Sequence, residues 1–173
     1  MSKNTTWTLD NTHSEIAFKV KHMMISTVTG HFEDFEATAK TDGDDFKGAD
    51  FNFSAKTASI NTKNKDRDTH LRSDDFFNSE KFPEMTFVSK SFDGEKLTGD
   101  LTIRDITKEV TLDAELNGVA VDPYGQTKAG FEMTRTINRK DFNLTWSAVT
   151  EAGSIVVSDK VKMVVDIQFT KEA

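Results

Sequence analysis

The stretch from Asp159 to Phe169, DKVKMVVDIQF, decides the fold of this chain. Apolar side chains occupy every second position of it, namely Val161, Met163, Val165, Ile167 and Phe169. Alternation with a period of two is the pattern of a β-strand that buries one face and exposes the other. Antiparallel sheets with one covered face are built from such strands. The stretch therefore predicts an all-β protein.

The same alternation recurs along the chain, at residues 15–22, 49–60, 84–92, 96–106, 109–119 and 129–137. Residues 25–41 form an eighth candidate strand, but Phe32 and Phe35 lie three positions apart, so a bulge near Glu33–Asp34 is needed to keep both rings on one side. Closing about eight strands into a barrel hides their edges and creates one common core. We predict one domain, residues 1–173, folded as an eight-stranded antiparallel β-barrel.

Residues 62–80 interrupt the alternation. Asp66 and Asp68 are typical of a helix start, so the sequence predicts a short helical insert around residues 64–80. The phenylalanines of this region need a surface to pack against. We expect them to face inward and plug one mouth of the barrel, the residues concerned being Phe76, Phe77 and Phe82.

Composition disfavours several classes of partner. The 173 residues include 22 basic and 29 acidic side chains, so the net charge is 22 − 29 = −7. This charge, without a basic run, disfavours nucleic acid and adsorption to anionic membranes. The chain contains no cysteine, so it has no disulfide and no cysteine-ligated zinc. It also has no apolar stretch long enough for a membrane span, so we expect no stable membrane insertion. The 14 phenylalanines suit a dry interior or an apolar cavity.

The first ten residues, MSKNTTWTLD, lack the apolar core of a signal peptide. If residue 1 is the native start, we expect a cytoplasmic protein. If a leader has been removed, a periplasmic or secreted location is expected instead. A monomer and a homodimer are equally compatible with the sequence.

Three stretches carry a resemblance to a known family. They are WTLDNTHSEIAFKVKHMMISTVTGHFEDF at 7–35, HLRSDDFFNSEKFPEMTFVS at 70–89 and INRKDFNLTW at 137–146. Together they resemble the YceI-like proteins, in order and over nearly the whole chain. At Asn143 the family usually has glycine, and asparagine also tolerates a positive φ angle.

The resemblance implies a lipocalin-like barrel that binds a long polyisoprenoid chain, of the polyprenyl or isoprenoid quinone type, in an apolar tunnel, for storage or transport. It implies no metal or nucleotide cofactor. A filled, ligand-free barrel that acts as a stress or interaction protein is the alternative. An enzyme acting on an isoprenoid finds less support, because the sequence has no G-x-S-x-G motif, phosphate loop or evident Ser/His/Asp set. We therefore expect a binding protein and not an enzyme.

The expected tunnel lining follows from the inward strand faces and the insert, and comprises Phe18, Val20, Phe51, Phe53, Phe76, Phe77, Phe87, Leu101, Ile103, Leu112, Phe131, Met133, Val165 and Ile167. Arg135 shares the parity of Met133, so it is a candidate contact for a polar head group, and His70 on the insert is a second. Their alternatives are an ion pair at a strand end for Arg135 and a local hydrogen bond for His70. His22 and His31 could meet across a hairpin, but we expect no metal site, since neither H-x-H nor H-E-x-x-H occurs. His13 is expected to fix a turn with Asp10.

Overall fold

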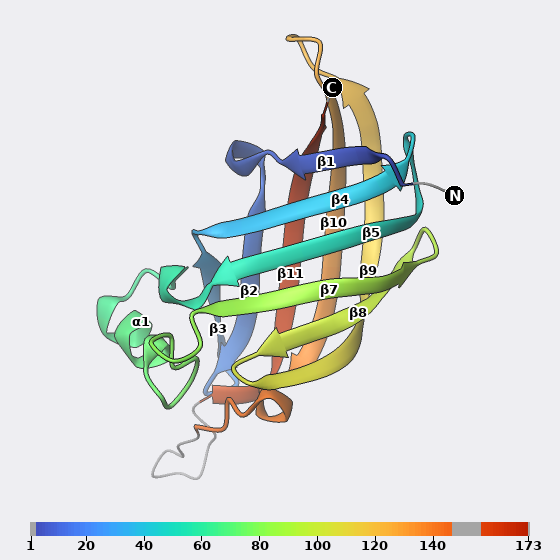
Figure 1. Cartoon of the computed structure of the whole chain (residues 1–173). Helices are drawn as coiled ribbons and strands as arrows, with labels where there is room; N and C mark the ends of the chain where they lie inside the picture. Colours follow the sequence, from blue (N-terminus) through green and yellow to red (C-terminus); the bar gives the residue numbers. More distant parts are fainter. Residues whose placement is uncertain (1–2, 147–156, 173) are drawn as a thin grey trace.

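The computed structural model describes residues 3–146 and 157–172, which are mostly β-strand (Figure 1). The strands are β1 (Thr5–Leu9), β2 (Glu15–His22), β3 (Ser26–Phe32), β4 (Phe35–Asp42), β5 (Asp45–Lys56), β6 (Ile60–Asn61), β7 (Glu84–Phe92), β8 (Lys96–Ile103), β9 (Ile106–Val121), β10 (Thr127–Asn138) and β11 (Val157–Lys171). The helix is α1 (Lys65–Arg72), and three short 3-10 turns are η1 (Asn11–His13), η2 (Thr57–Ser59) and η3 (Arg139–Phe142).

Eight strands form a closed antiparallel barrel. Around the barrel the order is β1, β4, β5, β7, β8, β9, β10 and β11, and β11 pairs back onto β1. Trp7 opposite Lys171 is one pair of this closing ladder. Closure gives every strand two hydrogen-bonded neighbours, which an open sheet cannot give to its edges. The predicted eight-stranded antiparallel barrel is thus confirmed.

The eight barrel strands are not the eight segments that the alternation predicts. Residues 25–41 do not form one bulged strand, as expected, but divide at Glu33–Asp34 into β3 and β4, and the rings of Phe32 and Phe35 are both buried. β4 joins the barrel between β1 and β5, whereas β2, β3 and the short β6 extend from β11 as a side sheet. The alternation analysis missed β1, because a strand of five residues with two apolar side chains, Trp7 and Leu9, is too short to show a clear period.

Helix α1 begins after Asn64, whose Oδ1 accepts a hydrogen bond of 3.0 Å from the backbone N–H of Arg67. Asp66 and Asp68 lie in its first turn, as expected, where carboxylates stabilise the positive end of a helix. The helix ends at Arg72, and residues 73–81 continue mainly as turns. The insert is therefore present but is less helical than the range 64–80 suggested.

Arg104 fastens the turn of the insert to the barrel. Its Nη1 donates hydrogen bonds of 2.9 Å to the carbonyl oxygens of Asp74 and Phe76, and its Nη2 lies 3.0 Å from the Asp74 carboxylate. Phe76 and Phe77 are buried beneath this turn. Phe82 instead lies half-buried outside, with the Arg104 guanidinium 5.4 Å from its ring centre, so its expected place in the plug is wrong.

One half of the barrel interior is filled by aromatic side chains. Phe46 packs against Trp7 and Phe131, with ring centres 4.9 Å apart in both pairs. Phe51 packs edge-on against Phe131 at 5.5 Å. The cluster contains Trp7, Phe46, Phe51, Phe92, Phe131 and Phe169, all almost completely buried. Rings from strands far apart in sequence thus close this half of the lumen.

A polar network ties the start of the chain to β10 and β11. The Asp10 carboxylate accepts hydrogen bonds from Lys128 and His13, both at 2.9 Å, and from Gln168 at 3.1 Å. Burial raises the pKa of Asp10, but hydrogen bonds from Lys128, His13 and Thr12, with the Lys128 charge, lower that pKa far more, to well below its usual range. The expected Asp10–His13 turn is confirmed.

Candidate functional site

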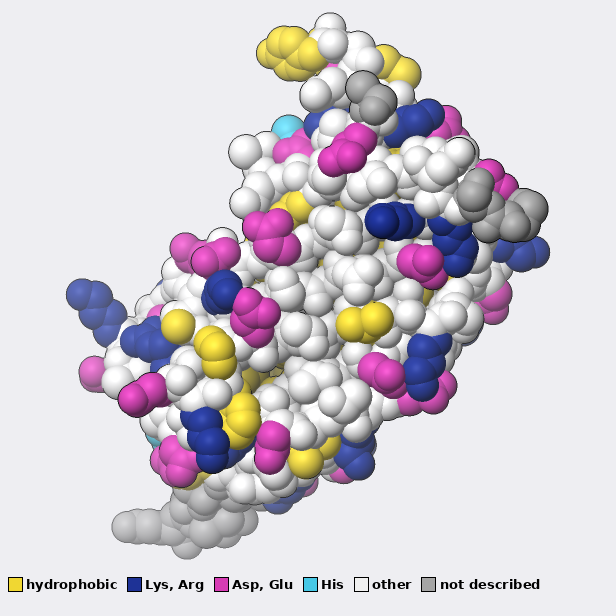
Figure 2. Space-filling model, viewed as in Figure 1, with side chains coloured by type: hydrophobic (Ala, Val, Ile, Leu, Met, Phe, Trp, Pro, Cys, Tyr) yellow, Lys and Arg dark blue, Asp and Glu magenta, His cyan; other side chains and the backbone are white. Residues whose placement is uncertain are grey.

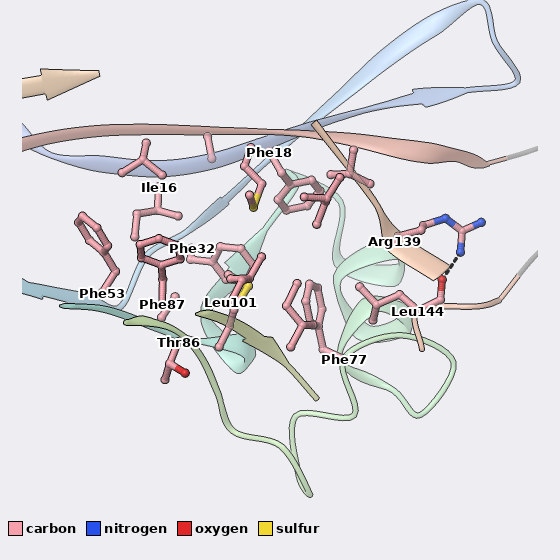
Figure 3. A pocket seen from close by; sticks show the side chains of 18 of the residues that line it. Ile16, Phe18, Phe32, Phe53, Phe77, Thr86, Phe87, Leu101, Arg139 and Leu144 are labelled. Carbon is pink, nitrogen blue, oxygen red and sulfur yellow. Dashed lines mark hydrogen bonds between the residues drawn. The ribbon is translucent and has the colours of Figure 1, made fainter. Parts of the chain in front are cut away.

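The other half of the barrel is hollow. A cavity of about 140 Å³ extends from the middle of the lumen to one end of the barrel (Figure 3). This is the end that carries α1 and η3 (Figure 1). Figure 3 shows Phe18, Phe32, Phe53, Phe87 and Leu101 surrounding it, whereas the Thr86 hydroxyl points away. The wall of this space is therefore almost entirely hydrocarbon.

Ten of the fourteen residues expected to line a tunnel do line this cavity, namely Phe18, Val20, Phe53, Phe76, Phe77, Phe87, Leu101, Ile103, Leu112 and Val165. The other four, Phe51, Phe131, Met133 and Ile167, face inward but lie in the core outside this cavity. Their expected place in the lining is wrong. That the ten residues contact a ligand stays a prediction.

Several lining residues escaped the prediction. Ile16, Met85, Val161 and Met163 lie on strand faces that the alternation marks as inward, so their signal was present in the sequence. Others come from irregular or rejoined segments and had no periodic signal. These are Phe32, Leu71 and Leu144, whereas Ile137 shares the parity of Met133 on β10 and could have been predicted.

Two glycines make room for the cavity's aromatic wall. A Cβ atom on Gly30 would lie 2.3 Å from the ring of Phe18, and one on Gly99 would lie 2.6 Å from the ring of Phe87. Each ring therefore lies flat across the neighbouring strand at a position where only glycine leaves enough space. Glycine inside a strand is the sequence signal for such a close approach.

Arg139 is the one ionisable side chain among the described residues that line the cavity. It is 2% exposed and donates hydrogen bonds to the carbonyl oxygens of Leu144 at 2.5 Å, Trp146 at 2.7 Å and Ser158 at 3.0 Å. Burial lowers its pKa, and the charge of Asp159, 3.7 Å away, opposes that shift. Because the guanidinium donors already have these acceptors, Arg139 joins the chain on either side of residues 147–156 and serves as a structural clamp.

The two expected head-group contacts lie outside the cavity. Arg135 is exposed, because β10 pairs with β9 only as far as Thr134, opposite Asp113, and Arg135 lies beyond that last pair. His70 forms a 2.8 Å contact with Asp75, the local partner that was its alternative. Its ring also stands edge-on to Phe76 and Trp146, at 5.1 and 4.8 Å. The expected position of Arg135 inside the tunnel is therefore wrong, whereas a head-group contact by His70 stays a prediction.

His22 and His31 do not face each other, because Ser26 lies opposite His22 and Ala17 lies opposite His31. His31 instead contacts Glu15 at 2.6 Å. Within residues 3–146 and 157–172, three or more histidines and acids nowhere gather as metal ligands would. In the same residues, no helix has both the length and the apolar character needed to cross a bilayer.

The fold and the site define a class of protein: an antiparallel β-barrel that encloses an apolar cavity, as lipid-binding barrels do. The chain matches the YceI-like domain over residues 7–169. It therefore belongs to the YceI-like family, which confirms the resemblance noted in its sequence.

Individual relatives agree over almost their full length. A UPF0312 protein of Staphylococcus aureus strain MSSA476 is 39% identical over 167 residues, which cover 96% of this chain and 98% of the relative. The crystal structure of the Campylobacter jejuni YCEI protein is 37% identical with a TM-score of 0.75, covering 95% and 97% of the two chains. A polyisoprenoid-binding domain from Saccharophagus degradans has a TM-score of 0.71 at 15% identity, covering 96% and 98%, and is similar in fold.

Proposed function

We propose that this protein binds the apolar chain of a polyisoprenoid lipid in its cavity and stores or carries that lipid away from water. The observation that carries the proposal is the lining: a wall of mainly aliphatic and aromatic side chains in which, among the described residues, Arg139 alone ionises and already has protein acceptors. The family supports the same class of ligand, since one structural relative is described as a polyisoprenoid-binding domain.

The volume limits which part of the ligand lies inside. About 140 Å³ is close to the size of a cavity that holds one benzene molecule, which is similar to a single five-carbon isoprene unit. The aromatic cluster around Phe51 blocks the other half of the lumen. A long chain therefore places its end unit in the cavity, and the remainder leaves by the end that carries α1 and η3, where the insert must move to admit more units.

Burial of an isoprenoid chain in the cavity is favourable relative to water but nearly neutral relative to a membrane. Burying one five-carbon unit gains about 4 kcal/mol relative to water, at ~0.8 kcal/mol per methylene. A bilayer offers the chain nearly the same gain, so transfer from bilayer to barrel is close to neutral. Selectivity then depends on how the chain end fits between Phe53, Phe87 and Leu101.

An enzyme is disfavoured by the same lining. Acid–base or nucleophilic chemistry needs titrating groups that converge on the bound molecule. Among the described lining residues only Arg139 ionises, and an arginine cannot release its proton at ordinary pH. The alternative of a ligand-free interaction protein draws on the filled half of the barrel, where aromatic side chains occupy the lumen.

The test is to purify the protein under native conditions, extract it with organic solvent and identify the released lipid by mass spectrometry. Val165→Phe places a ring in the cavity, whereas Val164→Phe is the matched change at the adjacent position, outside the cavity lining. We expect an isoprenoid from the wild type and Val164→Phe, and little from Val165→Phe. Equal lipid in both variants, or no lipid in any of them after incubation with isoprenoid-loaded vesicles, would refute the proposal.

A further inference from the structure

The turn that joins β2 to β3 exposes apolar side chains. Met24 is 62% exposed and Ile25 is 81% exposed, the latter among the most exposed large hydrophobic residues described. Water-facing hairpin turns normally use polar residues or glycine. A hairpin tip that exposes Met24 and Ile25 is therefore a feature that folding alone does not explain.

The backbone of this turn is also strained. Met23 and Met24 both have positive φ angles, of 52° and 60°, and the Ile25 N–H closes the turn on the His22 carbonyl at 3.1 Å. Two consecutive left-handed residues form a type I′-like turn, which strongly favours Asn–Gly. Strain that persists in a structure points to a use for the side chains concerned.

The β2–β3 turn lies at the end of the hollow half of the barrel. Val20 and Val157 line the cavity, and His22 pairs with Val157, so the turn begins one residue beyond the lining. In Figure 1, β2 and β3 meet at the same end as α1 and η3. The exposed tip and the end of the cavity therefore face the same way.

Four lysines stand beside the tip on the outer wall of β2 and β11: Lys19, Lys21, Lys160 and Lys162. Lys19 and Lys162 are directly opposite each other across the strands, an arrangement of like charges that destabilises a sheet. Across residues 3–146 and 157–172 none of the four forms an ion pair with an acidic side chain. The surface around these four lysines is therefore positively charged, although the net charge of the chain is −7.

We propose that this end of the barrel docks on an anionic lipid bilayer, with Met24 and Ile25 in the interface and the four lysines against lipid phosphates. Apolar side chains flanked by lysines are what peripheral membrane contacts use. Charges beyond about 10 Å are screened at physiological salt, so the local lysines outweigh the net charge that disfavoured adsorption. Docked in this way, the cavity end faces the bilayer, the source of apolar lipids. The proposal does not rest on the identity of the cavity ligand.

The test is flotation of the protein with vesicles of phosphatidylcholine alone and with vesicles that also contain phosphatidylglycerol. Binding is expected with the anionic vesicles and is expected to fall as salt rises. Lys21→Glu with Lys162→Glu should weaken partitioning at least tenfold, since each lysine near such a surface contributes about fivefold. Lys40→Glu with Lys47→Glu, two exposed lysines on β4 and β5, makes the same change in net charge and should have little effect.

The turn is tested separately by the triple change Met23→Asn, Met24→Gly and Ile25→Thr. Because Asn–Gly relieves the backbone strain, the melting temperature should rise while vesicle binding falls at least tenfold. Val121→Thr with Tyr124→Ser is the control, since these exposed residues lie on the β9–β10 hairpin at the opposite end, where hydrophobic side chains gather at the tip (Figure 2). No binding to anionic vesicles, equal binding to neutral ones, or equal loss in the controls would overturn the proposal.

Discussion

Replacing Phe77 with alanine tests whether the barrel is divided into a filled half and a hollow half. The Phe77 ring closes the cavity beneath the insert, is 8% exposed and has one aromatic neighbour, Phe32, edge-on at 5.7 Å. The substitution joins the space of the ring to the existing cavity. It should therefore affect both the stability of the fold and the retention of a ligand.

The magnitudes follow from the packing. Buried Phe→Ala changes cost about 3–5 kcal/mol, and Phe77 belongs at the lower end, ~3 kcal/mol, because one side of its ring already borders empty space. A bound chain would lose roughly 50 Å² of apolar contact, or ~1.3 kcal/mol. Release of a prenyl ligand should therefore accelerate about tenfold.

Phe51→Ala is the matched control in the filled half. This ring is fully buried and has ring neighbours on several sides, including Phe92 and Phe131, both at 5.5 Å. Its removal should cost more, ~4–5 kcal/mol, because every face of the ring loses a partner. Since Phe51 does not line the cavity, release from the folded fraction should not change.

The assay combines urea unfolding with stopped-flow release of a fluorescent prenyl analogue, measured where each variant is still folded. Phe77→Ala should show the smaller loss of stability and the larger increase in off-rate. If Phe51→Ala accelerates release as much as Phe77→Ala, the division into a filled and a hollow half is wrong. An unchanged off-rate in Phe77→Ala would show that this ring is ordinary core.

Three further predictions concern the scaffold. Because the pKa of Asp10 is lowered in the folded protein, its carboxylate stabilises the fold above about pH 4, and this contribution is lost as pH falls through the folded-state pKa. Asp10→Asn should therefore lower the free energy of unfolding by ~2 kcal/mol at pH 7 and by less at pH 2, as measured in unfolding experiments. Arg139→Met leaves four carbonyl oxygens without their donor and should lower the free energy of unfolding by ~3 kcal/mol. Protease cleavage near residues 147–156 is a second readout, and equal cleavage rates would argue against the clamp. Gly99→Ala places a Cβ atom 2.5 Å from the Val88 carbonyl oxygen and should cost ~1–3 kcal/mol in thermal melts, whereas Gly130→Ala, with open space around it, should be neutral within ~1 kcal/mol.

The sequence by itself determined the fold class, the family and the inward faces of the strands. Alternation marks a face without knowledge of any partner, because the side chains of a strand point to opposite sides in turn. The spacing of Phe32 and Phe35 also marked an irregularity at Glu33–Asp34, but the chain divides there into two strands instead of forming the expected bulge. Asn143 has a φ angle of 62° and ends η3, so the expected tolerance of asparagine is also confirmed.

The alternation of side chains along a strand predicted the wrong face where that strand loses a hydrogen-bonded neighbour. Arg135 has the parity of Met133, but β10 leaves β9 after Thr134, so the wall that would enclose the Arg135 side chain is missing at that position. Pairing between strands is a tertiary property, and the alternation within one strand carries no information about where its neighbour departs. The same holds for Phe82, whose partner Arg104 comes from a different part of the chain.

Only the tertiary structure decided which half of the barrel is hollow. Phe51 and Phe53 lie two residues apart on β5 and face the same way, yet Phe51 belongs to the filled half and Phe53 lines the cavity. The difference arises because Phe46, Phe131 and Phe169 bring large rings to one level of the lumen from three strands. The side chains that line the cavity and those that fill the lumen are of the same residue types. The free volume at each level of the barrel depends on the combined size of side chains from strands that are distant in sequence.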